Sequence, residues 1–245
     1  MENGNYSQST PEHLFANQTV SQTRAKTFLA NVFSYMFMAL AISGVVAWLL
    51  TSNIDWMITI ATNKALTYAV FFSPLVFALV LGFAFQRLSV FALLAIFIAY
   101  SAVIGVSISF ALIIYTQTSV VACFFSAAAM FGVMAFMGYT TKQDLTSFGR
   151  ILTMGLIGIV IASVINFFLQ NDTMSYIISF VGVMVFTGLT AYHMQKIKQI
   201  GEGVDANGNV LSKDVKKLSI IAGLTLYLDF INMFLMLLRL FGSRR

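Results

Sequence analysis

The segment Leu218-Ser-Ile-Ile-Ala-Gly-Leu-Thr-Leu-Tyr-Leu-Asp-Phe-Ile-Asn-Met-Phe-Leu-Met-Leu-Leu238 is long and apolar enough to cross a membrane, and its one charged residue is Asp229. A charged side chain at the centre of a bilayer costs at least ~2.5–3.5 kcal/mol, so such residues face a partner, a water-filled cavity or an ion path. Asn232 follows three residues later, on the same face of a helix. The segment therefore predicts an ion or proton site inside a membrane span.

The rest of the chain has the composition of a polytopic membrane protein. Of its 245 residues, 59% are hydrophobic and 9% are charged, and the mean hydropathy is +0.86. A soluble domain carries about 25% charged residues, so this chain lacks the polar surface needed to dissolve in water. The net charge of +5 does not gather into a basic cluster with interleaved aromatic residues, so we expect no nucleic-acid partner. The lipid bilayer is the expected partner.

Charge-free runs of about 20 residues mark the membrane spans. They predict seven helices, over about 27–50, 66–85, 88–114, 119–139, 151–169, 174–195 and 218–241. The uncharged run 88–141 is too long for one span and suits two, with a turn at 116–119. We therefore predict an all-α membrane protein: a disordered cytoplasmic tail over 1–26, a seven-helix transmembrane domain over 27–241 and a short tail over 242–245.

Basic residues in the loops predict the orientation, because cytoplasmic loops are enriched in Lys and Arg. Ten of the 14 basic residues fall in the amino-terminal tail and in the loops after the second, fourth and sixth spans: Arg24, Lys26, Arg87, Lys142, Arg150, Lys196, Lys198, Lys213, Lys216 and Lys217. The amino terminus is therefore expected in the cytoplasm. Arg239, Arg244 and Arg245 oppose this bias if the last helix crosses fully, and a re-entrant last segment would remove the conflict. Both arrangements stay open, and we favour seven full spans.

Two ionisable residues stand out within the spans, His193 and Asp229. His193 alone would be interpreted as an interfacial histidine with its polar tip in water. Asp229 alone could be a protonated carboxyl group that is hydrogen-bonded within the bundle. As a pair, each residue would lower the cost of burying the other. The sequence does not show whether they touch.

The other polar residues of the candidate site are expected to support it. Asn166 and Asn232 are buried amides of the kind that holds transmembrane helices together. Tyr227 lies two residues before Asp229, and Asp144 precedes the fifth span, where it offers a cap to free helical N–H groups. The sequence contains no His-Glu-x-x-His zinc motif and no Gly-x-Ser-x-Gly serine elbow. We expect neither an enzyme nor a protein with a cofactor.

Three motifs resemble those of the Bax inhibitor-1 family, also called the transmembrane Bax-inhibitor-motif proteins. They are Gly138-Tyr-Thr-Thr-Lys-Gln-Asp-Leu145, Thr187-Gly-Leu-Thr-Ala-Tyr192 with Gln195-Lys-Ile197, and Leu226-Tyr-Leu-Asp-Phe-Ile-Asn232 followed by Leu237-Leu-Arg239. The resemblance covers all seven spans in length and order and indicates a bacterial member, in the inner membrane. It implies a seven-helix bundle with the last helix central. It also implies a pH-sensitive calcium leak channel whose sensor is a pair of aspartates, latched by an arginine on the second helix.

This chain departs from the family pattern at one half of that sensor. Asp229 matches the second aspartate, the first falls on His193, and Arg87 is the candidate for the latch. Histidine titrates in the physiological range, so the resemblance implies a pH-responsive gate with altered pH dependence. Calcium binding at Asp229 is weakened as an expectation, because a hard cation prefers oxygen ligands and His193 offers nitrogen. The alternative function is a non-conducting modulator of other membrane proteins, such as a membrane-bound AAA protease.

Overall fold

The computed structural model describes residues 11–68, 70, 72, 76–77, 87–206 and 212–244. These residues are helical throughout, apart from turns and one isolated bridge pair between Tyr115 and Arg244. The helices are α1 (Pro11–Thr51), α2 (Ile54–Thr62), α4 (Val90–Ile114), α5 (Gln117–Thr140), α6 (Thr146–Leu169), α7 (Asp172–Ala206) and α8 (Ser212–Phe241). Within the described ranges, six of them are long and apolar enough to cross a membrane: α1, α4, α5, α6, α7 and α8.

The six long helices lie where the uncharged runs predict spans, because a helix satisfies its own backbone hydrogen bonds in lipid. Hydroxyl side chains mark two of the starts. Ser89 Oγ accepts from Ala92 N at 3.1 Å at the start of α4, and Thr116 Oγ1 accepts from Ser119 N at 3.4 Å at the start of α5. Thr116 and its neighbours therefore form the turn predicted within the uncharged run 88–141.

Two boundaries differ most from the predicted ones. Helix α1 begins at Pro11 instead of residue 27, so part of the predicted tail 1–26 is helical and its first ten residues lie outside the described ranges. Helix α7 continues to Ala206 instead of ending at residue 195. In both cases the helix extends past its apolar part, and hydropathy reports the apolar part alone.

The region between α1 and α4 holds the predicted second span. Most of residues 66–85 lie outside the described residues, so this span is not described by the structure. Before it, Ile54–Thr62 forms the short helix α2, which the charge pattern did not predict because Asp55 stands in its first turn. An acidic residue there is favourable, since it faces the positive end of the helix dipole.

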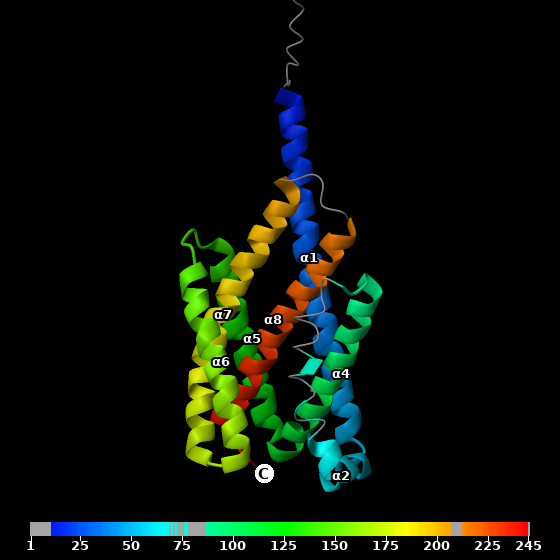
Figure 1. Ribbon diagram of the computed structural model, residues 1–245, viewed down its shortest axis with the longest axis vertical. Coiled ribbons are helices and arrows are strands. Elements are labelled where there is room, and N and C mark those ends of the chain that lie inside the picture. The colour runs from blue at the N-terminus through cyan, green and yellow to red at the C-terminus, as the bar shows by residue number, and fades with distance from the viewer. Residues whose placement is uncertain are drawn as a thin grey trace, which may run out of the picture.

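Helix α8 is the most buried of the six candidate spans, with 72% of its apolar window buried against 50% for α7 and 11% for α6. It packs against α1, α4, α5 and α7, and α6 packs against α7. Figure 1 shows α8 crossing the bundle obliquely, with α6 and α7 on one side and α4 on the other. The position of Asp229 on this helix therefore places a carboxylate among neighbours instead of facing lipid.

The residues that follow α8 are hydrogen-bonded to the turn between α4 and α5. Thr116 N donates to Ser243 O at 3.0 Å, and Ser243 N donates to Ser119 Oγ at 3.0 Å. Arg244 lies 3.8 Å from the carboxylate of Asp172, the first residue of α7. Helix α8 thus ends beside the α4–α5 turn and the start of α7, and it does not turn back as the re-entrant alternative requires.

Glycines allow two close helix approaches around the candidate site. A Cβ at Gly138 of α5 would overlap the backbone oxygen of Ala191 on α7. A Cβ at Gly223 of α8 would lie 2.9 Å from the backbone oxygen of Val32 on α1. In lipid, where close packing holds helices together, small residues at such contacts let the backbones meet. They set the distances of α7 and α8 from their neighbours.

Candidate functional site

The structure brings His193 of α7 and Asp229 of α8 into direct contact. His193 Nδ1 and Asp229 Oδ2 lie 2.7 Å apart, within hydrogen-bond distance. When the carboxylate is ionised, the imidazole N–H donates to it, and a protonated imidazole adds an ion pair. The two residues that the sequence singled out as a possible pair therefore form one unit between two neighbouring helices.

The two halves of the pair differ in exposure. The Asp229 side chain is 4% exposed and the His193 side chain is 21% exposed. The Tyr192 ring lies beside the imidazole, with 5.4 Å between ring centroids. The imidazole is therefore the more accessible half of the pair, and the carboxylate is almost fully buried.

A second polar cluster, which the sequence did not predict, lies on the other side of α8. It consists of Tyr227 on α8, Ser43 on α1 and Ser101 on α4. The hydroxyls of Tyr227 and Ser43 are 2.6 Å apart, and Ser43 Oγ lies 2.9 Å from the backbone oxygen of Ser101. All three residues are at most 1% exposed, and the Tyr100 and Phe97 rings lie edge-on to Tyr227. This serine–tyrosine joint links α8 to α1 and α4.

The remaining predicted residues occupy separate places. Asn232 donates from Nδ2 to Leu228 O at 2.9 Å, within α8. Asn166 donates to Ser175 Oγ at 2.7 Å and so connects the end of α6 to the start of α7. Neither amide contacts His193 in the hydrogen bonds of the described residues. They stabilise local structure and take no part in the His193–Asp229 contact.

The connector between α5 and α6 is held by Gln195 of α7, two residues after His193. Gln195 Oε1 accepts from Leu145 N at 2.9 Å, and its Nε2 donates to Gln143 O at 2.7 Å. Asp144 accepts from Thr146 N at 2.9 Å and also from the Thr146 hydroxyl, and these hydrogen bonds lower the pKa of Asp144. Asp144 is a turn residue at the start of α6 and does not belong to the pair.

Arg87 and Asp229 form no ion pair among the described residues. Arg87 is exposed in the turn before α4, and the ion pair that Asp229 makes is with His193. The predicted latch is therefore not in contact with the pair in this structure. The residues before Arg87, from 78 to 86, lie outside the described ranges.

The pair does not have the ligands of a resident metal site. No group of three or more His, Cys, Asp or Glu side chains that could hold a metal ion occurs in the described part of the chain. Calcium takes about six to eight oxygen ligands, and the pair offers one carboxylate and one nitrogen. The pair alone therefore does not supply the ligand set of a resident calcium ion.

These features define a class: an α-helical membrane protein with a titratable pair between two of its most buried helices. A family model described as "Inhibitor of apoptosis-promoting Bax1" matches residues 25–245. The inner membrane protein YbhL of Escherichia coli strain K12 is 41% identical over 231 residues, covering 94% of this chain and 97% of that protein. An uncharacterized protein of Rickettsia prowazekii is 38% identical over 222 residues, covering 90% and 91%. An uncharacterized membrane protein of Streptococcus pyogenes serotype M6 is 35% identical over 228 residues, covering 91% and 96%.

The chain belongs to the Bax inhibitor-1 family. The sequence motifs had indicated this family, and the match confirms it.

Proposed function

We propose that this protein is a pH-sensitive leak channel for calcium or other cations, and that the His193–Asp229 pair gates it. The observation that carries the proposal is the 2.7 Å contact between His193 Nδ1 and Asp229 Oδ2 across the α7–α8 interface. A neutral imidazole beside an ionised carboxylate leaves one net negative charge in the bundle, and one added proton makes the pair neutral overall. In a medium of low dielectric, this change alters both the attraction between the helices and the affinity for a cation.

The proposed fold adds two features to the six described spans. A seventh span over residues 66–85 joins the six described spans, and α8 is the central helix of the bundle. The amino terminus lies in the cytoplasm, as the loop charges predict. The protein resides in the bacterial inner membrane, supported by the relative from Escherichia coli. It works without catalysis and without a cofactor.

Calcium flux from liposomes that contain the purified full chain tests the proposal. We expect wild-type flux to change between about pH 5 and 8, the range in which imidazole titrates. Asp229→Asn should change this pH dependence, and His193→Asp should move it, because a dicarboxylate needs one more proton to reach neutrality. The matched control is Asp55→Asn, which makes the same chemical change at an exposed site in α2.

Two results would contradict the proposal. If Asp229→Asn leaked like wild type at every pH, the pair would not be the gate. If the wild-type protein gave no cation flux at any pH, the leak channel itself would be wrong. The non-conducting modulator would then be the better hypothesis, and recovery of a membrane-bound AAA protease with the intact protein would support it.

A further inference from the structure

A deep apolar groove runs along the side of the bundle between α1 and α5. Its volume is about 890 Å³, within the ~300–1,000 Å³ typical of small-molecule sites. Residues from Leu29 to Gly44 form the α1 wall, which at ~1.5 Å per residue is about 22 Å long. One leaflet of a bilayer has a hydrocarbon depth of about 15 Å, half of the ~30 Å core. The groove is therefore long enough for an acyl chain of one leaflet.

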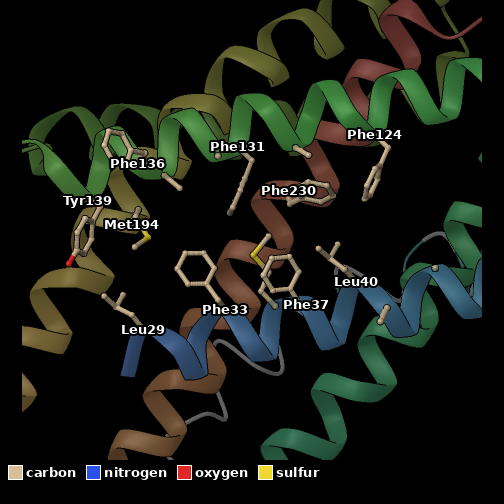
Figure 2. Close-up of a pocket in the computed structure, with 16 residues that line it drawn as sticks. Leu29, Phe33, Phe37, Leu40, Phe124, Phe131, Phe136, Tyr139, Met194 and Phe230 are labelled. Atoms are coloured by element: carbon tan, nitrogen blue, oxygen red, sulfur yellow. The ribbon is translucent and has the colours of Figure 1, made fainter. Parts of the chain in front are cut away.

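The groove is closed on the inside and open on the outside. Met194 of α7 and Phe230 of α8 are each 3% exposed and form its floor. Phe37 of α1 and Phe136 of α5 are 62% and 68% exposed and stand at its mouth. Figure 2 shows aromatic rings from α1 and α5 facing each other across this space. An occupant would enter sideways from the bilayer and contact hydrocarbon almost everywhere.

The groove continues into the core past Phe124. A second cavity of about 150 Å³ shares Leu40, Gly44 and Phe124 with it and reaches Ser43 and Ile231. An acyl chain that fills the groove would therefore end near the serine–tyrosine joint. Along its length the acyl chain would contact Met194 and Phe230, the sequence neighbours of His193 and Asp229.

One end of the groove has a basic rim, formed by Lys26, Lys142 and Lys198. This end is marked by Leu29 and Tyr139, which Figure 2 shows close to one another. Lys198 Nζ lies 5.0 Å from the centroid of the Tyr139 ring and donates to Tyr139 O at 3.0 Å. Lys26 and Lys142 are exposed, each three residues from a residue that lines this end. Among the described residues, the ion pair of this rim joins Lys198 to Glu202 at 3.9 Å, so three lysines stand against one paired carboxylate and the rim keeps a net positive charge.

We propose that this groove is a binding site for an anionic phospholipid of the bilayer. One acyl chain lies between α1 and α5, and the phosphate headgroup lies among the three lysines of the basic rim. The apolar groove and the basic rim fit one orientation of the lipid. The three lysines lie at the end of the groove where α1 and α7 extend past their apolar segments. The phospholipid would fill the space between α1 and α5 and rest on the two helices that carry the pair.

A second copy of this chain fits the groove less well. Two copies related by a twofold axis along the membrane normal would bring the basic rims together. Like charges at such close range are unfavourable. A phospholipid with a negative headgroup satisfies both the apolar groove and its rim.

Native mass spectrometry of the full chain tests this proposal, after release from nanodiscs of phosphatidylglycerol and phosphatidylethanolamine in equal amounts. We expect wild-type protein to retain phosphatidylglycerol in preference to phosphatidylethanolamine. Gly132→Phe should abolish this retention by filling the groove, since a Cβ at Gly132 meets nothing within 4 Å. The matched control is Gly158→Leu, which also has open space around its Cβ but lines a different cavity, between α6 and α7.

Charge variants test the headgroup end without changing the packing of the helices. Lys26→Gln and Lys142→Gln should each weaken phosphatidylglycerol retention by about fivefold, the effect of about one basic residue near an anionic lipid surface. Lys64→Gln, an exposed lysine beyond α2, is the control and should change nothing.

Three outcomes would overturn the proposal. Wild-type protein could retain the two lipids equally, which would mean a non-selective coat of bilayer lipid. Retention could survive both Gly132→Phe and the lysine variants, which would place the lipid elsewhere. A dimer could appear in wild type and be lost in Gly132→Phe without any change in lipid, which would assign the groove to a second copy.

Discussion

Two polar contacts on α8, only two residues apart, differ in what they can do. Tyr227 meets Ser43 and Ser101 in a neutral, fully buried joint that fixes α8 to α1 and α4. Asp229 meets His193, whose side chain is 21% exposed, in a contact between α8 and α7 whose charge depends on protonation. One contact joins two neutral hydroxyls, and the other joins two side chains that can each carry a charge. The proposed gate needs both, because a helix can move on one side only if the other side holds it.

The largest effect is expected from removal of the neutral joint. Tyr227→Ala takes a fully buried ring out of the core and leaves Ser43 without the phenol. Truncation of a buried aromatic residue costs about 3–5 kcal/mol, which lowers the Tm of a chain this size by roughly 10 °C. Thermal unfolding in detergent measures it. A variant with an unchanged Tm would show that α8 is held by other contacts.

Loss of the His193–Asp229 contact should change the pH dependence of flux and leave the fold intact. His193→Gln keeps a polar side chain beside Asp229 and removes the imidazole of the proposed gate. Calcium flux in liposomes should then lose its dependence on pH between about pH 5 and 8, and the fold should persist. If His193→Gln retained the wild-type pH profile, the imidazole would not be the proton acceptor. Tm measured beside the flux separates loss of gating from loss of fold.

A smaller change at the neutral joint sharpens the comparison. Tyr227→Phe removes one hydroxyl, and Ser43 Oγ keeps its hydrogen bonds to the backbone oxygens of Ser101 and Ala39. The expected loss is about 1 kcal/mol, the net contribution of one hydrogen bond. The pH at which flux changes should stay the same. A shifted pH profile in this variant would mean that the two sides of α8 are coupled through protonation.

The smallest effect is expected at Asp144, which lies outside the pair. Hydrogen bonds from Thr146 lower the pKa of Asp144, so its contribution to stability is complete above its unfolded value and is lost only as pH falls through the folded value, below about pH 4. Asp144→Asn should therefore leave the flux profile between about pH 5 and 8 unchanged. A change in that profile would show that the α5–α6 connector contributes to pH sensing.

The sequence predicted the apolar spans well and the ends of the helices poorly. Uncharged runs located α4, α5 and α6 to within a few residues, because lipid admits few charges along a helix. Hydropathy cannot follow a helix into water, so the continuation of α7 to Ala206 was missed. The helix α2 was missed as well, since a short segment that contains Asp55 resembles a loop.

The same limit applies to the candidate site. His193 and Asp229 could be selected from the sequence as rare ionisable residues in apolar runs, yet their contact depends on how α7 and α8 are rotated about their axes. Helices that are apolar on all sides carry no periodic signal for that rotation. Ser43 and Ser101 gave no signal, because single serines in membrane helices are common. The contact between Tyr227 and Ser43 therefore became visible only in the structure.

The burial of α8 also has a consequence for biosynthesis. Helix α8 is the last of the six long helices to leave the ribosome, yet it packs against α1, α4, α5 and α7. Until α8 is made, the surfaces of the earlier helices that it later covers remain uncovered in the membrane. They include the hydroxyl of Ser43 and the imidazole of His193. A chain that stalls before residue 212 would display these polar groups to lipid.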